Sequence, residues 1–105
     1  MHNELIVFMN ETRSFFQNVT IVNRLGLHAR AAGKLVKLTD QFNARVTVEK
    51  NNQIAEANSI MELLMLTAGT GDVLTIRSEG PEAKLALNAV VTLVQQGFEE
   101  DVERP

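Results

Sequence analysis

The pattern of apolar and polar residues predicts seven regular elements along this chain. They follow one another as strand, helix, strand, strand, helix, strand and helix, over residues 15–22, 29–38, 44–50, 53–58, 59–66, 72–78 and 80–96. The first stretch, FFQNVTIV, is rich in Phe and β-branched residues, which favour strands. The stretch ARVTVEK alternates apolar with polar residues, which is typical of a strand buried on one face. In DVLTIRS the same alternation is expected to turn Leu74 and Ile76 inward.

Two of the three predicted helices carry an apolar stripe at helical spacing. The first helix repeats its inward positions three or four residues apart, at Ala32, Leu35, Val36 and Thr39. Lys34 and Lys37 fall on its other faces. The last helix has a broader stripe, at Ala86, Leu87, Val90, Leu93 and Val94. Both helices are therefore expected to cover an apolar face of the sheet.

Turn and capping residues separate these elements. Asn51-Asn52 predicts a turn, which makes a hairpin of the strands on either side. Ser59 with Glu62 three residues later fits a capping box that opens a short helix. Gly80-Pro81 is expected to start the last helix, with Pro in the first turn. Gly97 is expected to end that helix.

This order predicts the α+β class. We expect an open-faced β-sandwich, in which a four-stranded antiparallel sheet is covered on one face by three helices. The pattern leaves the order of the strands in the sheet open. It assigns one domain to residues 14–98, an N-terminal extension to residues 1–13 and a polar C-terminal tail to residues 99–105. The order of the extension is also left open.

Composition removes several classes of function. The net charge is −3, and the chain has no Trp or Tyr and only five Phe, which argues against a nucleic-acid partner. The absence of Cys excludes disulfides and thiolate chemistry, and two His make a metal site improbable. No apolar stretch approaches the roughly 20 residues of a membrane span. We expect a cytoplasmic protein without a cofactor.

The segment NRLGLHARAAGKL places a histidine where a loop becomes a helix. If Ala29 opens the helix, His28 lies at or next to its N-cap, beside backbone N–H groups that lack partners within the helix. These N–H groups and the helix dipole favour anions. The same positive end, together with Arg30, disfavours a charged imidazolium, and a neutral imidazole is a nucleophile. The pattern therefore suits transfer of a phosphoryl group onto His28.

The energies suit a carrier. A helix end stabilises a charge by roughly 0.3–2 kcal/mol. Hydrogen bonds to charged groups contribute about 1.5–3 kcal/mol each. These contributions hold a phosphoryl group without trapping it. The alternative from residue types alone is that His28 is a turn residue and Arg30 a solvated charge. His2 lies in the extension and is expected to have no role.

The segment NRLGLHARAA resembles the active-site segment of the HPr family, the histidine phosphocarriers of the bacterial phosphotransferase system. EANSIMELLML resembles the regulatory-serine segment of that family, and GDVLTIRSEGP resembles its last strand with the turn that follows. The resemblance covers about residues 15–98. AEANS, LLML and the ending GFEED look most like the nitrogen-branch version of the family.

The resemblance implies an HPr-like fold and a role for each matching residue. His28 would accept the phosphoryl group through Nδ1 from phosphorylated enzyme I, and Arg30 would steady the group during transfer. A IIA protein would receive it. The docking surface of the family maps onto the His28 loop and exposed residues nearby, namely Ala29, Lys37, Ile60, Met61, Leu64 and Met65. For the last four, core packing is the alternative, but Leu63 and Leu66 can fill the core in their place.

Two positions need separate treatment. The family usually has Pro directly after the arginine, whereas this chain has Ala31, which favours the helix and supplies one more N–H donor. Ser59 matches a serine that an ATP-dependent kinase phosphorylates in some members. Its other interpretation is a helix cap, which stabilises by about 1 kcal/mol.

The leading hypothesis is a phosphocarrier, which is not an enzyme in the sense of turnover, and we expect it to be a monomer. The alternative is a regulatory protein-binding module that docks while His28 is unphosphorylated. A third class, an RNA-binding sheet, predicts aromatic residues on the central strands. ARVTVEK and DVLTIRS contain none.

Overall fold

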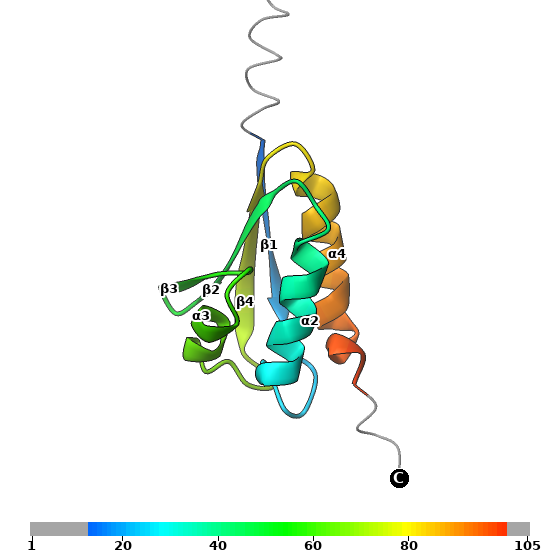
Figure 1. Ribbon diagram of the computed structural model, residues 1–105. Coiled ribbons are helices and arrows are strands. Elements are labelled where there is room, and N and C mark those ends of the chain that lie inside the picture. Colours follow the sequence, from blue (N-terminus) through cyan, green and yellow to red (C-terminus); the bar gives the residue numbers. More distant parts are fainter. Residues whose placement is uncertain (1–12, 101–105) are drawn as a thin grey trace, which may run out of the picture.

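The computed structural model describes residues 13–100 and confirms the α+β class (Figure 1). All seven predicted elements form, and a short 3-10 helix follows them. Their bounds are β1 (Ser14–Thr20), α2 (Ala29–Thr39), β2 (Arg45–Lys50), β3 (Gln53–Glu56), α3 (Ile60–Met65), β4 (Val73–Glu79), α4 (Ala83–Gln95) and η1 (Gly97–Glu99). None of the helices within residues 13–100 has the length and apolar character needed to cross a membrane.

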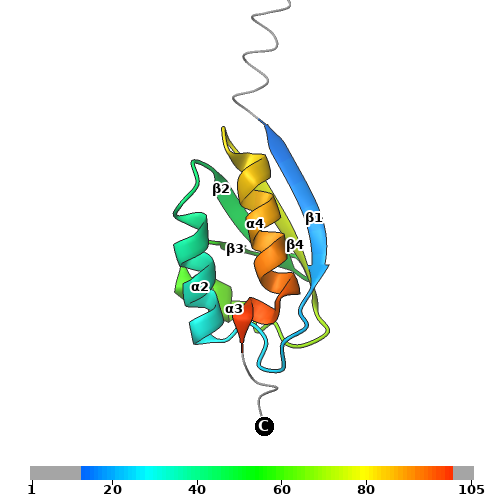
Figure 2. The same ribbon diagram turned by 90° about the vertical axis from the view of Figure 1, so that its right-hand side faces the viewer.

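The four strands form one antiparallel sheet in the order β1-β4-β2-β3. Helices α2 and α4 cover one face of it, as Figure 2 shows, and α3 packs against α2 and β3. In the central strand β4, Leu74 and Ile76 are completely buried, which confirms their predicted inward direction. Ile76 pairs with Gln17 of β1 on one side and with Val48 of β2 on the other. The strand order that the pattern left open is therefore set by two long-range pairings of β4.

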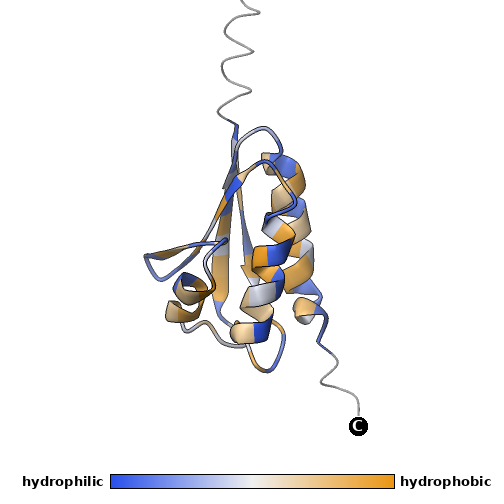
Figure 3. Ribbon diagram, in the orientation of Figure 1, coloured by the Kyte–Doolittle hydropathy of each residue, from blue (hydrophilic) through white to orange (hydrophobic). Residues whose placement is uncertain are grey.

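The core lies between the sheet and the helices, where Figure 3 shows apolar residues on β4, α2 and α4. Its largest fully buried side chains come from every layer, and they include Ile21, Leu35, Val48, Leu63, Leu74, Ile76, Val90, Val94 and Phe98. All five residues of the predicted α4 stripe are buried. In α2 the buried side chains are Ala31, Ala32, Leu35 and Thr39, while Val36 is partly buried.

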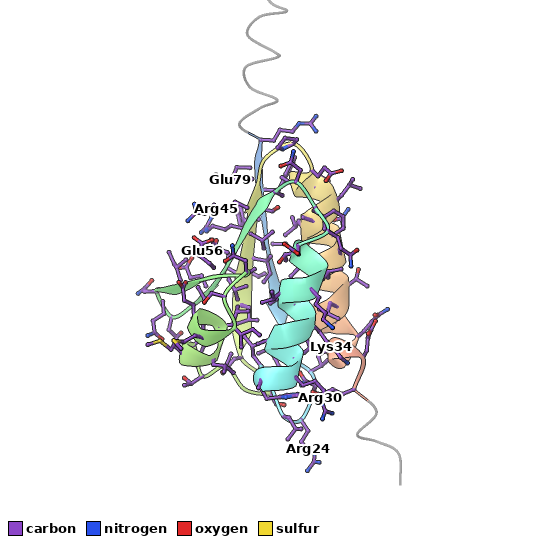
Figure 4. All side chains as sticks on the ribbon, viewed as in Figure 1. Arg24, Arg30, Lys34, Arg45, Glu56 and Glu79 are labelled. Carbon is purple, nitrogen blue, oxygen red and sulfur yellow. The ribbon has the colours of Figure 1, made fainter. Side chains whose placement is uncertain are left out.

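The opposite face of the sheet is exposed and carries paired charges. Figure 4 shows Arg45 between Glu56 and Glu79 on the side of the sheet away from α2 and α4. Nε of Arg77 lies 3.6 Å from Oε1 of Glu49, and the guanidinium lies over the ring of the exposed Phe16. Exposed ion pairs of this kind contribute at most about 1 kcal/mol each. Both arginines on this face are therefore paired with carboxylates of the sheet.

The starts of α4 and α3 each differ from the prediction in one respect. Gly80-Pro81 forms a turn ahead of α4, and the helix begins only at Ala83 because Glu82 has a non-helical backbone (φ −110°, ψ 30°), with its N–H bonded to the Asn43 carbonyl at 3.0 Å. At α3, the Ser59 hydroxyl accepts a hydrogen bond from the N–H of Glu62, as predicted.

The second half of the predicted capping box is absent. The Glu62 carboxylate accepts the N–H of Glu56 at 2.9 Å, and the N–H of Ser59 bonds the Glu56 carbonyl instead. This exchange ties the start of α3 to the end of β3, which stops at Glu56, two residues before the end of the predicted strand 53–58.

The loop that leads into α2 depends on a close backbone contact at Gly26. Gly26 has φ +66°, and a Cβ atom there would lie 2.6 Å from the Ala68 carbonyl oxygen and 2.8 Å from Gly69 Cα. The next residue, Leu27, is buried and donates its N–H to that same carbonyl at 3.0 Å. Only glycine combines this conformation with this approach. The contact holds the loop directly before His28 against Ala68 and Gly69.

We predict that Gly26→Ala destabilises the protein by more than about 2 kcal/mol, because it adds a steric clash to a left-handed backbone. Gly33→Ala is the matched control. Gly33 lies in α2 with open space around the position of a Cβ, so alanine there should stabilise by about 0.5–1 kcal/mol. Urea unfolding of both variants checks this pair. Equal stability of G26A and the parent chain would show that the contact at Ala68 is not restrictive.

Candidate functional site

His28 is the N-cap of α2, as the sequence predicted. Its backbone is extended (φ −84°, ψ −178°), and its carbonyl accepts the N–H of Ala32 at 2.8 Å. Its Nδ1 atom accepts the backbone N–H of Arg30 at 3.2 Å. A ring nitrogen that accepts a hydrogen bond carries a lone pair and no proton. The lone pair of Nδ1 therefore faces the open N-terminus of α2.

The surroundings leave the positive end of α2 available to an anion. The first turn of the helix contains no acidic residue. Arg30 is exposed, and its guanidinium forms no hydrogen bond with the rest of residues 13–100. Figure 4 shows Arg30 at the end of the molecule where α2 begins, together with Arg24 of the preceding loop. This end of the molecule can receive a negatively charged group.

The second ring nitrogen of His28 contacts a residue that the sequence did not reveal. Nε2 pairs with Oε2 of Glu100, and Oε1 of the same carboxylate accepts the side-chain amide of Asn23 at 3.1 Å. Glu100 lies 72 positions away in the chain. It was grouped with a polar tail because nothing in the sequence around it marks a site. The sequence-based expectation for His28 did not include this carboxylate.

The Glu100 carboxyl is held in its charged form. Burial alone would raise its pKa, but hydrogen bonds from His28 and Asn23, together with nearby positive charge, outweigh burial and hold the pKa below its usual value. The side chain is only 8% exposed. A charged, acceptor-only group therefore lies against Nε2 of His28.

A strained turn positions Glu100 next to the ring of His28. Gly97, Phe98 and Glu99 have φ values of 65°, 57° and 61°, so three consecutive residues are left-handed. For residues other than glycine this costs about 1–3 kcal/mol each. The turn is held because Phe98 is fully buried and its carbonyl accepts the Lys34 ammonium at 2.6 Å. Figure 4 shows Lys34 on the side of α2 next to this segment.

Helix α3 presents an apolar patch beside α2. Leu63 and Leu66 are buried, as expected. The six-residue helix cannot bury its remaining side, which leaves four exposed apolar side chains, Ile60 (43%), Met61 (73%), Leu64 (37%) and Met65 (66%). On the neighbouring α2, Ala29 and Lys37 are exposed as well. We call the four side chains the α3 patch. Ser59 caps this helix, and the cap accounts for a serine there.

The comparisons with known proteins identify the family of this chain. A family model described as the PTS HPr component phosphorylation site matches residues 16–96. The phosphocarrier protein NPr of Shewanella violacea is 44% identical over 84 residues, which are 80% of this chain and 92% of the relative. The phosphocarrier protein HPr of Cupriavidus necator is 39% identical over 80% of this chain and 94% of the relative.

A solved structure confirms the fold. The crystal structure of HPr from Thermoanaerobacter tengcongensis has a TM-score of 0.79 at 33% identity, covering 83% of this chain and 98% of that one. The fold and the matched residues together define a phosphocarrier. The chain belongs to the HPr family of the phosphotransferase system. Members of this family carry a phosphoryl group and are not catalysts.

Proposed function

We propose that His28 accepts a phosphoryl group on Nδ1 from phosphorylated enzyme I and passes it to a IIA protein in the cytoplasm. The observation that supports this is the position of Nδ1, whose lone pair faces the N-terminus of α2. In the forward step, Nδ1 attacks the phosphorus atom while the bond between that atom and the donor breaks. In the second step, a nucleophile of the IIA protein forms a bond to the phosphorus atom while the electron pair of the Nδ1–P bond returns to Nδ1.

The start of α2 supplies donors for the transferred group. In the free protein the N–H of Arg30 bonds Nδ1, and once Nδ1 carries phosphorus this N–H can bond a phosphoryl oxygen. The N–H of Ala31 lies in the same first turn and adds a donor that a proline would lack. The exposed guanidinium of Arg30 can then bond the oxygens that face solvent. These donors stabilise the phosphoryl group without enclosing it.

The partners would dock on the α3 patch and the adjoining part of α2. The patch is apolar, exposed and next to the helix that carries His28. A contiguous exposed apolar surface is typical of protein-binding sites. Relatives named HPr and relatives named NPr match this chain similarly well, so these matches do not distinguish the two branches. The assignment to the nitrogen-regulatory branch therefore rests on the segments AEANS, LLML and GFEED.

The acceptor role predicts a specific mass change. Incubation with enzyme I and phosphoenolpyruvate should add one acid-labile phosphoryl group to the protein, seen by intact mass spectrometry. His28→Ala should gain none, because it lacks the nucleophile. Arg30→Ala should keep the fold but slow the transfer by roughly ten-fold, since it loses about one charge-assisted hydrogen bond. No gain with a competent enzyme I would instead favour a regulatory module that acts by docking.

The docking role is tested with a pair of exposed apolar side chains. Met65→Ala truncates one side chain of the α3 patch, whereas Leu85→Ala truncates a side chain on α4. The two residues have comparable exposed fractions, 66% for Met65 and 58% for Leu85. We expect Met65→Ala to raise the KM for this carrier in the enzyme I reaction several-fold, with thermal stability unchanged. Leu85→Ala should alter neither quantity. Equal KM values for the two variants would place docking elsewhere.

A further inference from the structure

We propose that Glu100 is a positioning residue that holds the proton of His28 on Nε2 and thereby keeps Nδ1 open for phosphoryl transfer. This inference rests on the proposed function of His28 and adds a residue to it. Two hydrogen bonds specify the same form of the ring. Nδ1 accepts the N–H of Arg30, so it has no proton. Nε2 faces the Glu100 carboxylate, which can only accept, so Nε2 carries the proton.

The same contact acts on the phosphorylated ring. When Nδ1 carries phosphorus and Nε2 keeps its proton, the ring bears a positive charge, which Glu100 neutralises. On transfer, the Nδ1–P bond then breaks to release a neutral imidazole, with the proton still on Nε2. Without that proton the leaving group would be an anionic imidazolate, which is a poorer one. Glu100 therefore favours the form of phosphohistidine that gives up its phosphoryl group.

The placement of Glu100 is a built feature of the fold. Its carboxylate is fixed by the amide of Asn23, which is itself buried and also donates to the Gly26 carbonyl at 2.8 Å. Its backbone follows the left-handed turn that Phe98 anchors in the core. Figure 4 shows three cations at this end of the molecule, Arg24, Arg30 and Lys34. Among the described residues, Glu100 is the carboxylate that contacts the ring.

The test compares two adjacent carboxylates. Glu100→Gln removes the charge at Nε2 with little change of shape, and Glu99→Gln does the same for an exposed neighbour without a contact to His28. Nitrogen-15 NMR of the histidine rings reports the tautomer, and His28→Ala separates the signals of His28 from those of His2. We expect the parent chain and Glu99→Gln to show the proton on Nε2, and Glu100→Gln to show a population with the proton on Nδ1.

The transfer chemistry gives a second readout. Phosphorylated Glu100→Gln should lose its phosphoryl group to water, and pass it to a IIA protein, roughly ten-fold more slowly than Glu99→Gln, as expected for losing a charged partner of a histidine. An amide spectrum unchanged except near His28 shows that the variant is folded.

The outcomes are distinguishable. If Glu100→Gln shows the same tautomer and the same two transfer rates as Glu99→Gln, this proposal is overturned while the carrier function stays intact. If the parent chain accepts no phosphoryl group, the proposed function fails, and the tautomer measurement on the unphosphorylated protein still tests the Glu100 contact.

Discussion

The site depends on one hydrogen bond, from the backbone N–H of Arg30 to Nδ1 of His28. This bond makes the histidine the cap of α2, so the ring that we propose as the phosphoryl acceptor also caps the N-terminus of the helix. Capping requires an acceptor, and an acceptor nitrogen is a nucleophile. The same geometry therefore serves the stability of the helix and the chemistry of the ring. It also puts the unbonded donors of the first turn where an anion on Nδ1 would lie.

Distant segments of the chain meet around this cap. Gly26 lets the loop approach Ala68, and Leu27, the residue directly before His28, bonds the same carbonyl. From the other side, the turn after α4 brings Glu100 to Nε2. The left-handed conformation of Phe98 and Glu99 is unfavourable and is compensated by the burial of the Phe98 ring. The ring of His28 is thus held through both nitrogens.

The sequence predicted the parts of this arrangement that depend on local periodicity. The apolar stripe of α4, the inward Leu74 and Ile76 and the place of His28 at the start of α2 follow from spacing and helix-end chemistry. Glu100 could not be found in this way, because its partner is 72 positions away and a left-handed turn without a helical or strand period brings it there. Likewise, Glu62 bonds β3 instead of its own cap because the end of that strand lies within reach.

The central claim is that the two nitrogens of His28 have different tasks, Nδ1 as the acceptor and Nε2 as the holder of the proton. Phosphorus–nitrogen coupling in the NMR spectrum of the phosphorylated, nitrogen-15-labelled protein identifies the ring nitrogen that carries phosphorus. The account predicts coupling to Nδ1 of His28. Phosphorus on Nε2 would contradict it, because that product requires Glu100 to leave the ring and removes the phosphoryl group from the donors at the start of α2.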